Sequence, residues 1–299
     1  EVAAAGFHHI LMIGPPGSGK TMIAKRIPTI LPDLSMEESL EVSTIYSVAG
    51  QLDDRNALIT KRPFLDPHHT ISAQALAGGG RIPKPGAVSL AHRGVLFMDE
   101  LPEFRRGTIE ILRQPLEDKR IHIARTSGSF VYPADFMLVG AMNPCPCGHF
   151  PDRNKCTCSE TEVKKYLSRI SGPILDRIDV ITQAPRVDIR QLSATMHNES
   201  SADIRERVMG ARERQNRRYR GTGYHFNAEL RAGDIRTYCP LGTEEQAMME
   251  EIFTIMNLSA RAYHKVIKVA RTIADLDGKD DIGTAHLGEA VCYRMNDRN

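Results

Sequence analysis

The segment GPPGSGKT at residues 14–21 constrains the fold of this chain more than any other stretch. It fits the pattern G-x-x-x-x-G-K-[ST] at each fixed position, after an apolar run at 10–13 and before the helical run TMIAKRI. Glycines in such a loop turn backbone N–H groups toward phosphate oxygens, and the following helix points its positive end at the same anion. The residues predicted to contact ATP are Gly14, Pro15, Pro16, Gly17, Ser18, Gly19, Lys20 and Thr21.

Two carboxylates end a second apolar run, GVLFMDE at residues 94–100. Such a run is typical of a buried parallel strand, whose C-terminal residues emerge at the ligand-binding edge of a sheet. We predict that Asp99 lies beside a Mg2+ ion held by the Thr21 hydroxyl, while Lys20 neutralises the β and γ phosphates. Glu100 is then the predicted general base for the attacking water. A strand followed by an exposed acidic turn is the alternative.

A third apolar run, FMLVGAM at residues 136–142, ends at Asn143. A third buried strand would bring this amide beside the two carboxylates, where it could hydrogen-bond the γ phosphate or the water. Asn143 is therefore a predicted sensor of the nucleotide. The alternative is an asparagine that only starts an Asn-Pro turn.

The composition is that of a globular protein, and the length is enough for the two domains that we expect. The 299 residues are 41% hydrophobic and 25% charged, and no apolar run approaches the roughly 20 residues that cross a bilayer. The N-terminus shows no secretory signal pattern, so we expect a cytoplasmic protein without a membrane partner. The chain starts almost at the first predicted strand, and we therefore expect that an upstream domain has been removed. A net charge of +2 is too small to predict nucleic-acid binding by itself.

The ordered set GPPGSGKT, VLFMDE and AMNP resembles an AAA+ ATPase of the magnesium-chelatase-like group that includes the ComM-type competence proteins. The segments SLAHRGVLFMDELPEF, PADFMLVGAMNPCPCG, RISGPILDRID and LSARAYHKVIKVARTIADL extend the likeness to about residue 290. The resemblance implies an α/β fold with a parallel sheet sandwiched by helices, hairpin and loop insertions, and a C-terminal helical lid. A Lon-protease-like N-terminal domain, typical of the group, is not in this sequence.

Buried runs give way to helical patterns after QAPRVD. We therefore expect a nucleotide-binding domain at residues 1–187, with a cysteine-cluster insertion at 145–158, and a helical lid at 188–299.

The resemblance also assigns roles to two arginines. Arg177 in ILDRID matches an arginine finger that reaches the γ phosphate of a neighbouring subunit, which implies a ring, in this group a hexamer. Arg261 in LSARAYHKVI resembles the second sensor of AAA+ lids. Arg177 could instead pair with Asp176 or Asp179, and Arg261 could face solvent. Arg169 is a further cationic candidate near Arg177.

Two insertions are predicted to project into the pore of such a ring. AGGGRIPKPGAVS at residues 77–89 has the glycines and prolines of an exposed loop, and two strand-like runs around TSGS predict a hairpin between Lys119 and Phe136. By resemblance, Arg125, Arg81 and Lys84 are candidates for DNA contact. Solvated surface charges are the alternative.

Four cysteines follow Asn143 as two C-x-C pairs: Cys145, Cys147, Cys156 and Cys158. Four thiolates suffice for a closed, structural Zn2+ site, although the spacing differs from the usual C-x2-C, and His149 could replace one ligand. Free thiols or a redox pair are the alternatives.

The function implied by the resemblance is an ATP-hydrolysing, hexameric ring motor on single-stranded or branched DNA. Its most specific form is a helicase that promotes branch migration when DNA is integrated in natural transformation and recombination. The alternatives are a chelatase-type subunit, which remodels a partner that inserts magnesium into a porphyrin, and a scaffold that assembles when it binds ATP.

Overall fold

A computed structural model describes residues 1–52, 58–80, 82–125, 128–185 and 199–295. Its centre is a sheet of five parallel strands in the order β2-β5-β8-β1-β9, which confirms the predicted α/β class. The strands are β1 (Ile10–Ile13), β2 (Phe64–Leu65), β5 (Val95–Met98), β8 (Met137–Met142) and β9 (Val180–Gln183). Every residue of β5 and β8 is buried, because a parallel sheet is covered on both faces.

Helices cover both faces of the sheet. On one face, α1 and α2 pack with α11 over the strand residues Met12, Phe97 and Val139. On the other face, short helices from the middle of the chain pack over Leu11, Leu96 and Leu138. The first group is α1 (Val2–Gly6), α2 (Lys20–Ile30) and α11 (Ser201–Arg218); the second is α4 (Ala73–Ala77), α5 (Ala87–Leu90), α6 (Arg106–Glu110), α7 (Arg113–Asp118), α8 (Glu160–Leu167) and α9 (Gly172–Leu175).

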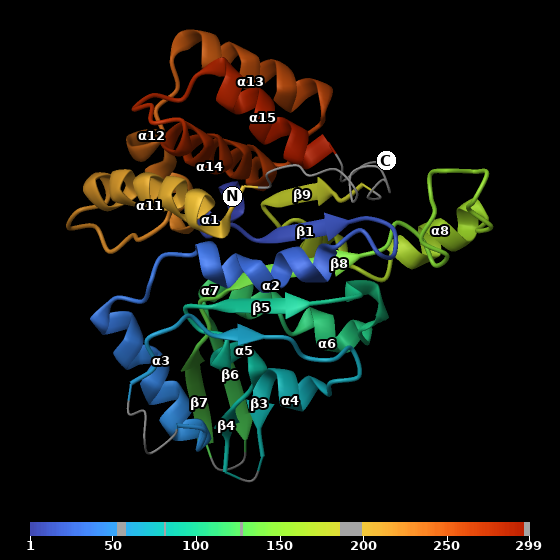
Figure 1. Cartoon of the computed structure of the whole chain (residues 1–299), viewed down its shortest axis with the longest axis vertical. Coiled ribbons are helices and arrows are strands. Elements are labelled where there is room, and N and C mark those ends of the chain that lie inside the picture. The colour runs from blue at the N-terminus through green and yellow to red at the C-terminus, as the bar shows by residue number, and fades with distance from the viewer. Residues whose placement is uncertain (53–57, 81, 126–127, 186–198, 296–299) are drawn as a thin grey trace.

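Two hairpins extend from the sheet on the side opposite the C-terminal helices (Figure 1). β6 (Arg120–Arg125) pairs with β7 (Gly128–Pro133), as the sequence predicts. Segment 77–89 differs from the predicted exposed loop, because it forms a second hairpin of β3 (Gly78–Gly79) and β4 (Lys84–Pro85) and begins α5. Only glycine fits at residue 78, where a Cβ atom would lie 2.5 Å from the carbonyl oxygen of Lys84. The hydroxyl of Tyr132 donates to the carbonyl of Pro83 at 2.7 Å and so joins the two hairpins.

The C-terminal helices form their own apolar core. They are α12 (Ile235–Tyr238), α13 (Thr243–Ile255), α14 (Ala260–Leu276) and α15 (Thr284–Met295), and α3 (Met36–Ala49) lies far from them beside the hairpins (Figure 1). The predicted boundary after residue 187 lies outside the described residues. Among the described helices, none combines the length and apolar character needed to cross a membrane.

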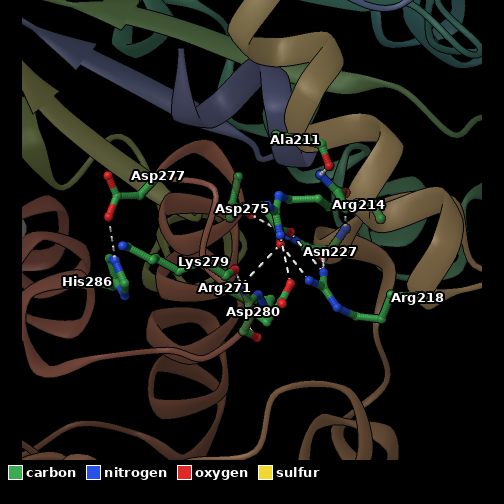
Figure 2. A network of polar contacts seen from close by, with 12 residues as sticks. Ala211, Arg214, Arg218, Asn227, Arg271, Asp275, Asp277, Lys279, Asp280 and His286 are labelled. Carbon is green, nitrogen blue, oxygen red and sulfur yellow. Dashed lines mark hydrogen bonds and ion pairs between the residues drawn. The ribbon is translucent and has the colours of Figure 1, made fainter.

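A buried carboxylate links α14 to its neighbours. Asp275, 1% exposed, accepts two hydrogen bonds from Arg218 of α11, at 2.5 and 2.9 Å, and one from Asn227 at 2.9 Å. Arg271, also 1% exposed, pairs with the same carboxylate at 3.1 Å. Figure 2 shows these side chains converging on Asp275. Because both arginines depend on it, this carboxylate stabilises the packing of α11 on α14.

We predict that Asp275→Ala lowers the free energy of unfolding by about 3–5 kcal/mol, because it leaves Arg271 buried without its counter-charge. Asp280→Ala is the matched control: Asp280 pairs with Arg214 at 2.7 Å but is 94% exposed, so its loss costs less than about 1 kcal/mol. Urea denaturation of both variants measures the difference, and equal destabilisation would contradict this role of Asp275.

Candidate active site

The phosphate loop joins the end of β1 to the start of α2 at Lys20. Gly17 has a φ of 77° with open space around its missing Cβ, so the backbone conformation alone requires glycine. At Gly14 the requirement is steric, because a Cβ would lie 2.3 Å from the carbonyl oxygen of Ala184 after β9. Gly19, the N-cap of α2, offers no side chain, so the first N–H groups of the helix remain available to an anion.

Lys20 is buried within this loop. Its ammonium donates to the carbonyl oxygens of Gly14 at 2.7 Å and Pro15 at 2.9 Å, and to Asn143 Oδ1 at 3.3 Å. Burial lowers the pKa of Lys20, and the charges of Asp99 and Glu100 partly oppose that shift. The structure thus brings the predicted phosphate-binding lysine and the predicted sensor amide together.

The predicted magnesium-binding pair also meets. The Thr21 hydroxyl donates to Asp99 Oδ2 at 2.7 Å, across the gap between the start of α2 and the end of β5. A hydroxyl beside a carboxylate at the phosphate loop is a donor set that Mg2+ accepts together with phosphate oxygens and water. These two residues therefore fit the ion that the sequence implied.

Glu100 projects from the same edge of the sheet. It adopts a left-handed conformation with a φ of 51°, a strained arrangement for a non-glycine residue that is concentrated at functional sites. Its carboxylate lies 3.8 Å from the ring of His69 and is more than half exposed, so that water can reach it.

His69 and Asp66 also lie at this edge of the sheet, although the sequence did not predict them as site residues. Both follow β2, and burial raises the pKa of Asp66, with a further contribution from the charge of Asp99. The signal in the sequence was FLDPHH, a short apolar pair followed by polar residues at a strand end. β2 has only two residues, Phe64 and Leu65, too few to give a recognisable pattern.

The predicted arginines lie elsewhere. Arg177 precedes β9, which runs parallel to β1, so it lies at the amino-terminal edge of the sheet, opposite the phosphate loop. Its guanidinium contacts neither Asp176 nor Asp179 in the described bonds, but pairs with Glu117 and donates to the carbonyl of Pro173 at 2.6 Å. Arg261 donates to the same Glu117 at 3.0 Å. Glu117, which the sequence did not indicate, therefore joins the two arginines at the rim of a cavity of about 420 Å³.

Asp179 pairs with a lysine and not, in the described bonds, with Arg177, the partner that the sequence left open. It pairs with Lys265 of α14 at 2.5 Å and accepts a hydrogen bond from the backbone of His9 at 2.9 Å. Burial raises the pKa of this carboxyl, but Lys265 and the nearby histidines outweigh that effect and hold it well below its usual range. The pair connects the C-terminal helices to the sheet directly beside Arg177.

The remaining candidates are spread over other surfaces. Arg169 pairs at 2.9 Å with Glu103, which follows Glu100 closely in the sequence. Lys84 is exposed on β4. Arg81 and the side chain of Arg125 lie outside the described residues.

The four clustered cysteines do converge. One sulfur from each lies within 4.8 Å of the others, and none of them forms a disulfide. The pKa shifts of these thiols differ in direction: a hydrogen bond from the backbone of His149 lowers the pKa of the Cys147 thiol, whereas burial raises the pKa of the Cys156 thiol.

Comparison with known proteins decides the family. The model described as "Magnesium chelatase, subunit ChlI" matches residues 1–192, and that of the ChlI C-terminal region matches residues 198–294. The chain belongs to the magnesium chelatase ChlI family. The predicted resemblance to the magnesium-chelatase-like AAA+ group is thereby confirmed, together with the α/β fold and its C-terminal helical region.

The matches to individual relatives cover different shares of each protein. It is 48% identical to protein YifB of Escherichia coli over 300 residues, all of this chain and 58% of that protein. It is 44% identical to competence protein ComM of Haemophilus influenzae over 295 residues, 98% of this chain and 57% of the relative. The magnesium-chelatase 67 kDa subunit of Chlorobaculum parvum is 30% identical over 130 residues, 43% of this chain and 18% of that subunit. The chain thus spans under three fifths of the curated relatives that it matches throughout.

We predict that Thr21→Val weakens binding of a non-hydrolysable ATP analogue about tenfold in the presence of Mg2+, because the hydroxyl bonded to Asp99 is lost. With the metal chelated, the variant and the wild type should bind equally. Thr29→Val, on the exposed side of the same helix, is the control. Calorimetric titration measures both affinities; weakening that does not depend on Mg2+ would count against Thr21 as a metal ligand.

Proposed function

We propose that this chain hydrolyses ATP and that copies of it form a ring motor that moves along DNA. The observation that carries the proposal is the gathering of Lys20, Thr21, Asp99, Glu100 and Asn143 at the carboxyl edge of one sheet. These side chains are the set that phosphoryl transfer to water requires: charge at the phosphates, a metal site, a base and a polar positioning group.

In the proposed reaction each residue has one task. The phosphate loop and Lys20 bind and orient the phosphates, and Thr21 and Asp99 hold Mg2+, which supplies charge neutralisation when bound. Glu100 accepts a proton from the attacking water, and Asn143, fixed by Lys20, orients that water or the γ phosphate. His69, 3.8 Å from Glu100, helps to orient the base.

The two arginines support a ring. Arg177 lies at the edge opposite the phosphate loop, so its guanidinium is directed away from the nucleotide of its own subunit. A neighbouring copy could present its γ phosphate to Arg177 and Arg261 in place of Glu117. In this proposal both arginines act on the neighbour in the ring, and their rigid donor forks spread the charge of the transition state.

DNA is the proposed substrate. One relative that matches 98% of this chain is named a competence protein, and the paired hairpins include Lys84 on β4 and Arg125 at the end of β6. Arg81, the third candidate for DNA contact, lies outside the described residues. Branch migration during natural transformation and recombination, in the cytoplasm, is the specific form that we propose. A chelatase-type role is the second candidate, supported by the family and by the shorter match to a magnesium-chelatase subunit.

The deciding experiment is steady-state ATP hydrolysis with and without single-stranded or forked DNA at low salt. A DNA motor should hydrolyse ATP at least several-fold faster when DNA is present. If the protein assembles with ATP but hydrolyses it equally fast with and without DNA, the DNA-motor proposal is wrong. If it assembles but does not hydrolyse ATP, the result favours an assembly scaffold.

We predict that Glu100→Gln binds ATP normally but hydrolyses it at least about 100-fold more slowly, because the amide cannot accept the proton. Glu103→Gln, which changes a nearby carboxylate bonded to Arg169, is the control and should retain most activity. Binding is measured by titration and turnover by phosphate release, and normal turnover in Glu100→Gln would refute the assigned base.

We predict that Arg177→Ala and Lys20→Ala, each inactive alone, regain partial ATP hydrolysis when mixed. The mixture contains interfaces in which an intact phosphate loop meets an intact Arg177 from the neighbouring copy. Mixtures that stay inactive, although the subunits co-assemble, would contradict action between subunits.

A further inference from the structure

The sulfur atoms that follow β8 have the geometry of a single metal site. Cys145 Sγ lies 3.3 Å from Cys147 Sγ and 3.8 Å from Cys156 Sγ, and the last two are 3.6 Å apart. A disulfide bond is only about 2.05 Å long. Four sulfurs at about 2.3 Å from one zinc ion form a tetrahedron with edges of about 3.8 Å, so the observed separations suit one tetrahedral ion.

The surroundings of the sulfur atoms also suit a bound metal ion. The backbone N–H of Phe150 donates to Cys145 Sγ at 3.4 Å, the type of bond that orients metal-bound cysteine. Cys145 is fully buried, which places one ligand in the protein interior. Residues 143–159, all described, contain neither helix nor strand. Irregular segments of this length are uncommon in compact domains, and a bound metal ion would hold this one in shape.

The same segment packs on the phosphate loop. At Gly148, whose φ is 82°, a Cβ would lie 2.4 Å from Cδ of Pro16, so the two loops are in close contact. Phe150 and Pro151 line a cavity of about 620 Å³ together with Gly14 and Pro15. Asn143, bonded to Lys20, stands two residues before the first cysteine.

We propose that Cys145, Cys147, Cys156 and Cys158 bind one Zn2+ ion and that this ion holds segment 144–151 against the phosphate loop. Four thiolates leave no open position for substrate, so the site is structural. Soft sulfur ligands select zinc over Mg2+. An iron–sulfur cubane binds each cysteine to a different iron and would hold the sulfurs farther apart than one ion does. The metal site stands on the sulfur geometry, whereas its effect on ATP rests on the proposed nucleotide binding.

The first test is the metal content of the purified wild-type chain. We expect about one zinc per chain, no iron, and, after replacement by Co2+, the intense visible absorption of a tetrahedral thiolate complex. Cys156→Ser should lose the metal, whereas Cys292→Ser, which changes an exposed cysteine outside the cluster, should keep it. Metal-free wild type, iron, or zinc retained in a variant that lacks two of the four cysteines would overturn the site. The wild-type measurement decides even if the serine variant fails to fold.

The second test is the affinity for a non-hydrolysable ATP analogue. Cys156→Ser should bind it at least about tenfold more weakly than wild type, and Cys156→His, which restores a zinc ligand, should recover both metal and affinity. Unchanged affinity in a folded, zinc-free variant would overturn the proposed role of the ion in holding the segment against the phosphate loop. Wild type that carries zinc but binds no ATP would contradict the proposed function and the proposed effect of the ion on ATP binding, while the metal site would remain.

Discussion

The structure depends on the position of β1 between β8 and β9. The backbone N–H of Gly14 donates to the carbonyl of Met142 at 3.1 Å, and that of Ala184 donates to Ile13 at 2.7 Å, so the ladder continues into the phosphate loop. The start of the loop is therefore anchored on both sides, to β8 at Gly14 and to the residue after β9 at Ile13. Because the strands are parallel and in register, Asp99 and Asn143 emerge at the same edge.

In the proposed function, the two edges of the sheet carry the two halves of the catalytic site. The carboxyl edge gathers the groups that bind phosphate and prepare water, while the amino edge carries Arg177 and Arg261 on a shared Glu117. Within one copy of the chain the two halves lie apart, because Arg177 precedes β9 and Arg261 is on α14, at the edge opposite the phosphate loop. A complete site then requires a second copy, so assembly and hydrolysis become one event in the proposed function.

The C-terminal helices are tied to this frame by buried charges. Asp179 beside β9 pairs with Lys265, and Asp275 pairs with Arg218 of α11, which itself packs on α2. Breaking such pairs is costly, because a charge is left in the interior. A movement of these helices would therefore displace both Arg177 and α2, the helix that begins at Lys20.

Much of the site was predictable from local patterns. The strand–loop–helix unit follows from glycines and a lysine within eight residues, and Ser259 caps α14 through a bond to the N–H of Ala262 at 3.1 Å. The 120–133 hairpin and the buried strands ending at Asp99 and Asn143 follow from alternation and apolar runs. Each depends on backbone preferences and burial over a few neighbouring residues, which the sequence by itself determines.

Only the tertiary structure decided which distant groups meet. Glu117 pairs with residues 60 and 144 positions away. His69 lies beside Glu100 because it follows β2, a strand too short to recognise in the sequence. The placement of Arg177 opposite the phosphate loop follows from the direction of β9 in the sheet. Strand order and packing set these contacts, and both are properties of the whole chain, because each strand is positioned by the neighbours it pairs with rather than by its own residues.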